Sequence, residues 1–292
     1  MAAASGSRAD GPRIISDPEL MRREVHAARG RGRRVGFVPT MGALHDGHVS
    51  LVERAAAECD DVAVSIFVNP TQFGPGEDFT RYPRNLEADV AAVASRGAAW
   101  IFAPEPDAIY PPGWATRIVV DGPARRFEGE IRPGHFSGVA TVVCRLFLVV
   151  PADAAYFGAK DWQQTLVVKR MVRDLGLPIA IVVCPTIREP DGLAMSSRNA
   201  YLSLAERPRA VALHESLVLA ERGWRSGDEV AAIERAMRAH LASREIVVDY
   251  AAIVDRDSLE PLSSPAGDAI AIVAGRLGTT RLIDNHPLPR RG

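Results

Sequence analysis

Residues 35–48 read VGFVPTMGALHDGH, and this stretch decides the fold that the sequence predicts. Its first part, 35–40, is a near-continuous apolar run, as expected for a strand buried on both faces of a parallel sheet. The turn that follows contains glycine and polar residues, and residues 49–59 then carry apolar side chains at helical spacing. A strand, a short turn and a helix in this order begin a strand–helix–strand unit.

Four more apolar runs continue this pattern: VAVSIFV at 62–68, AAWIFAP at 98–104, AAYFGAK at 154–160 and IAIVVCPT at 179–186. Helical patterns lie between them. Asn85 can cap a helix that ends at Gly97, and Asp161 with Gln164 three positions later opens another. We therefore predict an α/β fold, with a doubly wound parallel sheet of Rossmann-like type over residues 1–186.

The pattern changes in the remaining part of the chain, residues 187–292. Two helices with polar faces are expected at 204–224 and 228–243, followed by strand-like runs at 247–254, 269–274 and 279–283. These elements predict a small α+β domain. Because no flexible Gly/Ser linker separates the halves, we expect the two domains to pack closely, with the C-terminal domain closing over the site.

Composition restricts the partners. Lys and Arg number 35 against 36 Asp and Glu, and no long basic block is present, so a nucleic acid is a poor candidate partner. The longest apolar stretch, 139–150, contains Arg145 and is shorter than the roughly 20 residues that span a bilayer, so we expect no membrane contact.

The terminal tail and the cysteines indicate the compartment. The first twelve residues lack an apolar core, which favours a loose tail over a secretory signal and predicts a cytoplasmic protein. The three cysteines are widely separated among apolar residues, as is typical of reduced, packed thiols: Cys59, Cys144 and Cys184.

His45 and His48 are the first candidates for chemistry. They lie three residues apart at a predicted helix start, at the carboxyl edge of the sheet, where N–H donors bind phosphate. Gly47 between them lets a nucleotide approach the backbone. On spacing alone, two chance surface histidines are about equally probable, and a zinc pair is a weaker alternative because no third ligand has a metal-motif spacing.

A second cluster, GAKDWQQ at 158–164, lies where another strand ends. Lys160 can reach ATP phosphates as a mobile charge, or it can be an ordinary solvated lysine. Asp161 is adequately explained as a helix cap. Gln164, one turn into the helix, can donate to a substrate carboxylate or hydroxyl.

Two further clusters carry polar donors. In EPDGLAMSSRN at 189–199, the donors Ser196, Ser197 and Arg198 can close over a triphosphate, or form only a capped polar turn. In VNPTQF at 68–73, Asn69 and Gln72 are expected at the carboxyl edge of the second strand, where amides suit a hydroxy acid. No phosphate-binding GxxxxGK[ST] string occurs, and GPGEDF is not a dinucleotide fingerprint.

Six segments together resemble the pantothenate synthetase family, in that family's order from near residue 35 to residue 202. They are PTMGALHDGH, IFVNPTQF, EDFTRYPRN, GEIRPGHF, GAKDWQQ and GLAMSSRN. The C-terminal hundred residues resemble the family in segment order and length only. The resemblance implies membership of the HxGH nucleotidyltransferases.

It also implies a two-step reaction. The carboxylate of pantoate would attack the α-phosphate of ATP and expel pyrophosphate, and the amine of β-alanine would then displace AMP to give pantothenate. His45 and His48 would stabilise the α-phosphate transition state, with His48 as proton donor and Lys160 and Arg198 assisting. The residues implied around ATP are Met41, Gly42, Ala43, Leu44, His45, Asp46, Gly47, His48, Gly158, Ala159, Lys160, Asp161, Ile187, Met195, Ser196, Ser197 and Arg198.

The other implied contacts concern the remaining substrates and the metal. Gln72 and Gln164 would hold pantoate, with Gln72 also near β-alanine. Mg²⁺ would bridge the phosphates, and Asp89 is the one protein candidate for contacting it, although an exposed helical aspartate is an equal alternative. The family is usually a homodimer. Asp46 and Ala159 depart from the family pattern, at positions where the chemistry needs no side chain.

Other functions remain as alternatives. A different HxGH adenylyltransferase acting on a phosphate-bearing substrate would need several Arg or Lys residues where this chain offers Gln72 and Gln164. A class I aminoacyl-tRNA synthetase is disfavoured by the near-neutral charge. A non-catalytic nucleotide sensor would bind ATP without turnover, and pyrophosphate exchange distinguishes it from an enzyme.

Overall fold

The computed structural model describes residues 11–264 and 267–290, which divide into two compact units. Unit 1 contains the described part of Met1–Asp121, with Arg132–Ala159 and Val167–Pro185. Unit 2 contains Gly122–Ile131, Lys160–Leu166 and the described part of Thr186–Gly292. Two segments from the predicted domain 1–186 thus group with the C-terminal residues. The loose tail predicted for the first twelve residues lies, up to Asp10, outside the described chain.

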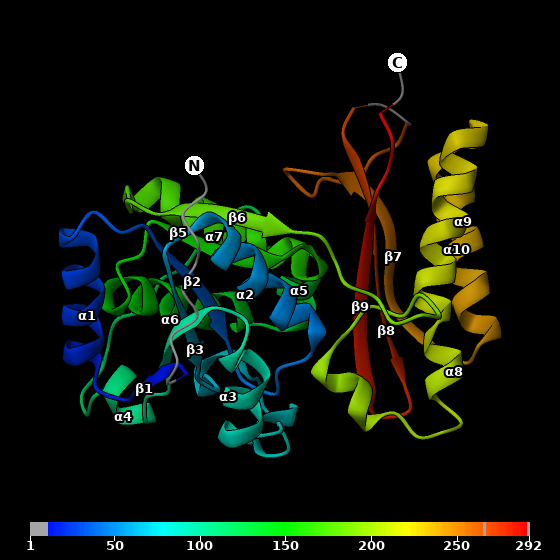
Figure 1. The fold of residues 1–292 in the computed structure, drawn as a ribbon. Helices are drawn as coiled ribbons and strands as arrows, with labels where there is room; N and C mark the ends of the chain where they lie inside the picture. The colour runs from blue at the N-terminus through cyan, green and yellow to red at the C-terminus, as the bar shows by residue number, and fades with distance from the viewer. Residues whose placement is uncertain (1–10, 265–266, 291–292) are drawn as a thin grey trace. The chain divides into compact units, whose positions relative to one another are not determined.

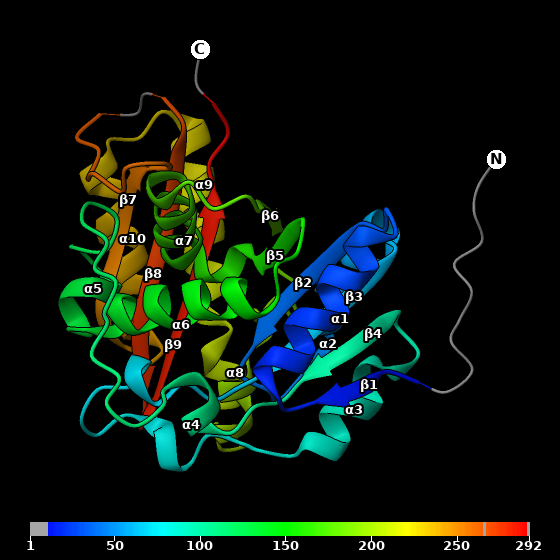
Figure 2. The same ribbon diagram turned by 90° about the vertical axis from the view of Figure 1, so that its left-hand side faces the viewer.

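Unit 1 is built on a six-stranded sheet in which every pairing is parallel, in the order β1-β4-β3-β2-β5-β6. Figure 2 shows β2, β3, β4 and β1 side by side. The expected doubly wound sheet is therefore confirmed. The strands are β1 (Arg13–Ile15), β2 (Val35–Thr40), β3 (Asp61–Ile66), β4 (Ala98–Phe102), β5 (Ala154–Gly158) and β6 (Ala180–Cys184).

The sequence missed only β1 in this sheet. This edge strand has three residues, of which only Ile15 is buried, so it leaves no apolar run to detect. Its pairing with β4 comes from tertiary structure.

Helices and short 3-10 turns link these strands. α2 packs against β2, β3 and β5, and α1 contacts α6. Asn85 caps α3 as expected, and α2 begins at Asp46, three residues before the predicted pattern. The elements are α1 (Pro18–Gly30), α2 (Asp46–Glu58), η1 (Pro70–Gln72), η2 (Asp78–Thr80), α3 (Leu86–Ala94), α4 (Pro106–Ile109), α6 (His135–Val149), η3 (Ala159–Asp161) and α7 (Trp162–Leu175).

Unit 2 contains the three-stranded antiparallel sheet β7-β8-β9, with α9 and α10 packed on it (Figure 1). Its core includes Leu217, Trp224, Met237, Ile253 and Val273. The predicted α+β pattern is confirmed. The elements are α5 (Glu128–Ile131), η4 (Ser197–Tyr201), α8 (Arg207–Ala210), α9 (Ala212–Ser226), α10 (Val230–Ser243), β7 (Val247–Asp255), β8 (Ala269–Leu277) and β9 (Thr280–Pro287).

The helix predicted over 204–224 is not observed as one continuous helix. The helical residues start at Arg207, with a proline in the first turn, and are divided into α8 and α9. Leu204, which continues the apolar pattern, is 97% exposed. The predicted helix was therefore too long at its start, because the apolar pattern there includes a residue that does not pack in the core.

Two smaller expectations concern cysteines and membranes. All three cysteines are free; Cys144 and Cys184 are buried and Cys59 is partly buried. Across residues 11–264 and 267–290, no helix combines the length and the apolar character needed to cross a membrane.

Candidate functional site

Two histidines lie at the start of α2, as the sequence predicts. His45 is the N-cap residue and His48 is in the first turn, with their ring centroids 4.1 Å apart. Nδ1 of His45 accepts the backbone N–H of Gly47 at 3.1 Å, and Nδ1 of His48 accepts that of His45 at 3.4 Å. A neutral imidazole carries one proton, so in each ring that proton is on Nε2. Both rings thus supply an N–H donor at a helix N-terminus, where anions bind.

The turn that precedes these histidines is held by Asp89 of α3. Gly42 and Ala43 have positive φ values of 82° and 50°. The Asp89 carboxylate accepts the backbone N–H of Ala43 at 3.0 Å and of Leu44 at 2.7 Å. Asp89 is only 4% exposed, so the alternative of an exposed helical aspartate is wrong. Its role as a metal ligand stays a prediction, although each of its oxygens already accepts one hydrogen bond.

Gln72, predicted to bind substrate, lies at the end of η1 and is buried. Its Oε1 accepts Nδ2 of Asn69 at 3.1 Å, and its Nε2 donates to the sulfur of Met41 at 2.8 Å. The structure therefore brings Gln72 next to the segment that carries the histidines. Gly138 of α6 makes this possible, because a Cβ there would lie 2.3 Å from the Thr71 carbonyl oxygen.

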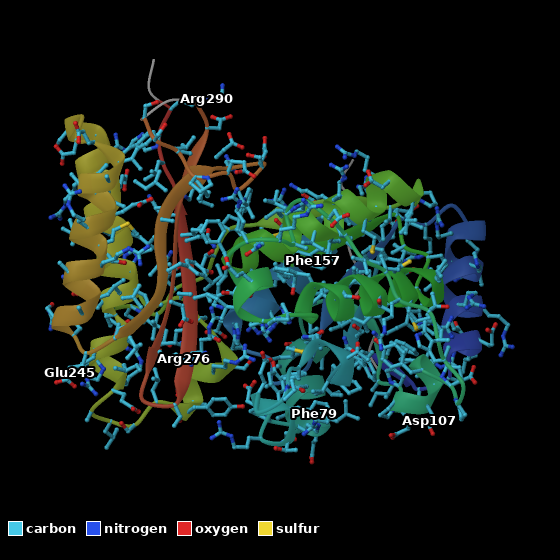
Figure 3. The ribbon with its side chains drawn as sticks, turned by 180° about the vertical axis from the view of Figure 1, so that it is seen from behind. Phe79, Asp107, Phe157, Glu245, Arg276 and Arg290 are labelled. Carbon is cyan, nitrogen blue, oxygen red and sulfur yellow. The ribbon has the colours of Figure 1, made fainter. Side chains whose placement is uncertain are left out.

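A charged group supports the backbone of Gln72. Nδ1 of His135 lies 2.8 Å from the Gln72 carbonyl oxygen, and its Nε2 lies 3.0 Å from Arg132. Arg132 in turn donates two hydrogen bonds to Glu77, at 2.8 and 2.6 Å. Burial raises the pKa of Glu77, but Arg132 outweighs this, so that pKa lies below its ordinary value. Phe79, labelled in Figure 3, packs on Phe73, directly after Gln72.

In unit 2, the predicted residues begin at Lys160, in the 3-10 turn η3 directly before α7. The backbone carbonyl of Lys160 accepts Nδ2 of Asn285 at 2.7 Å, and its ammonium lies 4.0 Å from Asp161. The two neighbouring glutamines differ. The amide of Gln163 is buried and bonded to Glu128, Pro123 and Arg126, whereas Gln164 is only partly buried. Gln164 is therefore the better placed of the two to meet a ligand.

Ile187 and Met195 lie on the two sides of an antiparallel turn, and Ser196, Ser197 and Arg198 follow it at the start of η4. The backbone N–H of Met195 donates to the carbonyl of Ile187 at 3.0 Å, which brings these two together. Ser196 caps η4, its hydroxyl accepting the N–H of Arg198 at 3.3 Å. Ser196, Ser197 and Arg198 are consecutive in the chain, and all three are partly exposed.

The predicted residues thus fall into two sets. Unit 1 holds Gln72, Asp89 and the segments 41–48 and 158–159, and unit 2 holds the others: Lys160, Asp161, Gln164, Ile187, Met195, Ser196, Ser197 and Arg198. Sequence reasoning did not select Glu77, Tyr110, Arg132 or His135, which contact Gln72 directly or through other side chains. The charges in GEIRPGHF were the available signal for two of them.

The donor set for a metal ion is small. Among the residues that the structure describes, no three His, Cys, Asp or Glu side chains group in a way that could hold a metal ion. Mg²⁺ normally uses one or two carboxylates together with substrate phosphates and water. Asp89 alone is compatible with that pattern as a single additional ligand.

A parallel sheet with two N–H donors suited to phosphate at the start of α2, the helix between β2 and β3, defines a Rossmann-like protein of the nucleotide-binding class. The model of the Pantoate-beta-alanine ligase family matches residues 13–287. The chain therefore belongs to this family, and it is an enzyme, a ligase.

Individual relatives agree with the family match. The pantothenate synthetase of Moorella thermoacetica is 51% identical over 93% of this chain and 97% of its own length. A crystal structure of pantothenate synthetase from Thermus thermophilus has a TM-score of 0.90 at 51% identity, covering 95% of this chain and all of the other. The pantoate-beta-alanine ligase of Francisella tularensis, complexed with beta-gamma ATP and beta-alanine, has a TM-score of 0.78 at 34% identity, covering 94% and 97%.

Proposed function

We propose that this ligase joins pantoate to β-alanine in two steps driven by ATP. A carboxylate oxygen of pantoate attacks the α-phosphorus of ATP and pyrophosphate leaves, giving a pantoyl-adenylate. The β-alanine amine then attacks the acyl carbon, AMP leaves, the nitrogen loses a proton, and pantothenate forms. Family membership supports the ligation, and the relative complexed with beta-gamma ATP and beta-alanine supports the use of ATP.

The observation that carries the first step is the direction of the histidine protons. Negative charge grows on the α-phosphate oxygens as the pantoate oxygen approaches, and preorganised donors stabilise it. Because Nδ1 of His45 and of His48 each accept a backbone N–H, their protonated Nε2 atoms are the donors for that charge. The family resemblance implies that His48 is also a proton donor. A ring that gives up its Nε2 proton must first gain one on Nδ1, so in this proposal the neutral His48 acts through its Nε2–H hydrogen bond.

The remaining ATP contacts are assigned by residue chemistry. The segment 41–48 is assigned to ATP by the family resemblance and lies at the start of α2. Gly158 ends β5, and Ala159 follows it at the same sheet edge. Lys160 and Arg198 carry positive charge for the leaving pyrophosphate, and Ser196 and Ser197 supply hydroxyl donors. Asp161, Ile187 and Met195 are assigned to the nucleotide by the family resemblance alone. Mg²⁺ would arrive with ATP and neutralise phosphate charge, with Asp89 as candidate ligand.

Gln72 and Gln164 are assigned to pantoate. Their amides can hydrogen-bond to its hydroxyl and carboxylate oxygens. Because both side chains are neutral, neither forms an ion pair that would hold the pantoate carboxylate back from the α-phosphorus. A phosphate-bearing substrate would instead favour arginine or lysine at these positions. The homodimer and the cytoplasmic location stay predictions.

The test is exchange of labelled pyrophosphate into ATP, measured with and without pantoate and in the absence of β-alanine. We expect exchange only when pantoate is present, because reversible adenylation requires the acceptor carboxylate. Exchange that ignores pantoate would contradict the pantoate assignment. No exchange in either condition, with normal ATP binding, would favour the nucleotide sensor.

A further inference from the structure

Asn69 has an amide whose two ends are distinguished by the backbone. Its Oδ1 accepts the backbone N–H of Thr71 at 3.3 Å, and its Nδ2 donates to the backbone carbonyl of Gly138 at 3.2 Å. A backbone N–H can only donate and a carbonyl can only accept. Turning the amide over would set donor against donor and acceptor against acceptor. Since Asn69 is fully buried, water cannot relieve that mismatch, so the orientation is fixed.

Tyr110 strengthens this orientation. Its hydroxyl donates to the same Oδ1 at 2.8 Å, a shorter contact than the 3.0 Å hydrogen bond from the Thr71 hydroxyl. The ring of Tyr110 is held between Phe67 and Trp114, with centroid distances of 6.3 and 5.6 Å. Burial raises the pKa of Tyr110, so its hydroxyl keeps the proton that it donates.

The fixed amide of Asn69 then sets that of Gln72. Nδ2 of Asn69 donates to Oε1 of Gln72 at 3.1 Å, so the carbonyl end of Gln72 faces Asn69. The NH₂ end must face the other way, where Nε2 meets the sulfur of Met41 at 2.8 Å. The Gln72 NH₂ group has two hydrogens. The Met41 thioether is a weak acceptor and engages only one of them, so the other can donate to a ligand.

We propose that Tyr110 and Asn69 are positioning residues that make Gln72 an N–H donor toward an oxygen of pantoate. This inference rests on the proposed function for the identity of the ligand. A donor stabilises a carboxylate or hydroxyl oxygen, whereas an inverted Gln72 would present its own carbonyl oxygen and repel a carboxylate. The hydrogen-bond chain thus selects an acceptor-rich hydroxy acid without adding a charge.

Two variants test the hydrogen-bond chain from Tyr110 through Asn69 to Gln72, each at a different link. Asn69→Asp keeps the acceptor for Tyr110 and Thr71 but removes the donor to Gln72, so Gln72 must turn its NH₂ group toward the new carboxylate. Tyr110→Phe removes one hydrogen bond and leaves the donor in place. We expect the KM for pantoate to rise about 3- to 30-fold in Tyr110→Phe and further in Asn69→Asp. The KM for ATP should stay within about twofold.

Tyr156→Phe is the matched control. Tyr156 is also a buried tyrosine of unit 1, and its hydroxyl donates to Glu58 at 2.9 Å, near the end of α2 opposite to the histidines. Its loss should lower stability without changing the KM for pantoate. A pantoate KM within twofold of wild type in both test variants, or an equal rise in the ATP KM, would overturn the inference.

A second measurement does not depend on pantoate. In the ¹⁵N-labelled enzyme, the side-chain NH₂ signals of Gln72 are assigned by their loss in Gln72→Ala. We expect both test variants, but not Tyr156→Phe, to shift these signals and speed their exchange with water. If wild-type enzyme failed to use pantoate, the proposed function would fall while this measurement still judged the positioning. Unchanged Gln72 signals in both variants would sink the positioning role itself.

Discussion

At the residue scale, the direction of hydrogen bonds determines what each polar side chain can do. The histidines of HDGH are interchangeable by residue type with any surface pair, yet backbone N–H groups hold both Nδ1 atoms as acceptors. Asp89 acts in the same way on the turn before them. Both effects depend on contacts that spacing alone does not reveal.

Replacing His48 tests its assigned role. We expect His48→Ala to slow single-turnover adenylate formation by about 10² to 10⁴, because the Nε2–H donor to the α-phosphate is lost. Thermal unfolding should change little. His26→Ala, on an exposed position of α1, is the control and should adenylate normally. Unchanged adenylation in His48→Ala would contradict the role.

Replacing Asp89 separates its two possible roles. Asp89→Asn turns one acceptor into a donor that faces a backbone N–H, so we expect a loss of about 1–3 kcal/mol in unfolding free energy and slower adenylation. If the turn is the cause, raising Mg²⁺ will not restore the rate. Recovery at high Mg²⁺ would instead support a metal contact. Glu87→Gln, exposed on the same helix, is the control.

At the element scale, close approaches between segments set the geometry of the site. α6 lies against η1 because Gly138 has no side chain, and the turn at 189–193 lies over α9 because Gly192 has none. A Cβ at Gly192 would lie 2.3 Å from the ring of His214. Each glycine therefore records a packing contact that a sequence pattern does not predict.

A side chain at Gly138, where α6 approaches η1, should disturb Gln72. In Gly138→Ala the new methyl group would lie 2.3 Å from the carbonyl oxygen of Thr71 and 2.7 Å from Cα of Gln72. We expect unfolding free energy to fall by about 1–3 kcal/mol and the pantoate KM to rise. Gly30→Ala has open space around it and should be neutral or slightly stabilising in denaturant melts. Equal behaviour of the two variants would refute the packing argument.

His214, which packs against Gly192, should make the stability of the fold depend on pH. Burial lowers its pKa below the ordinary 6.5, aided by the charges of Arg188 and His286 and opposed by Asp284 and Glu215. The unfolded chain therefore binds a proton at a higher pH than the folded chain does. Folding stability should fall as pH drops below about 6.5 and level off below the folded pKa.

The pH dependence is measured by chemical denaturation at several values from about pH 8 to about pH 5, which bracket the ordinary histidine pKa. His214→Gln should reduce the loss of stability on the acid side, because the replacement does not titrate. His26→Gln, whose side chain is exposed on α1, should leave the slope as in wild type. An unchanged slope in His214→Gln would show that other groups cause it.

At the scale of the whole molecule, each unit has its own core, and unit 2 also depends on a buried ion cluster. Arg281 of β9 donates to Glu128 of α5 at 2.6 and 2.7 Å and to Asp249 of β7 at 2.6 Å. The Tyr250 hydroxyl also donates to Glu128, at 2.9 Å. This cluster holds the segment 122–131, far away in sequence, in the same unit as the C-terminal sheet.

Removing the cation should therefore destabilise unit 2. Arg281→Met leaves Glu128 and Asp249 buried without their partner, and we expect a loss of about 3–5 kcal/mol. Arg225→Met breaks an exposed ion pair with Glu221 within α9 and should cost less than about 0.5 kcal/mol. Denaturant titration of both variants gives the comparison. Similar small losses would show that the cluster contributes little.

The sequence by itself determined the strand order of appearance, the fold class and the candidate residues, because parallel strands are buried on both faces and helix starts carry recognisable caps. Even so, β1 and the start of α8 escaped it. Only the tertiary structure decided the pairing of β1 with β4, the placement of the segment 122–131, and the proton positions on His45 and His48. The physical reason is twofold. The first two features depend on contacts between residues that are distant in sequence, and the third depends on which atom of each ring accepts a hydrogen bond. Local periodicity carries no information on either.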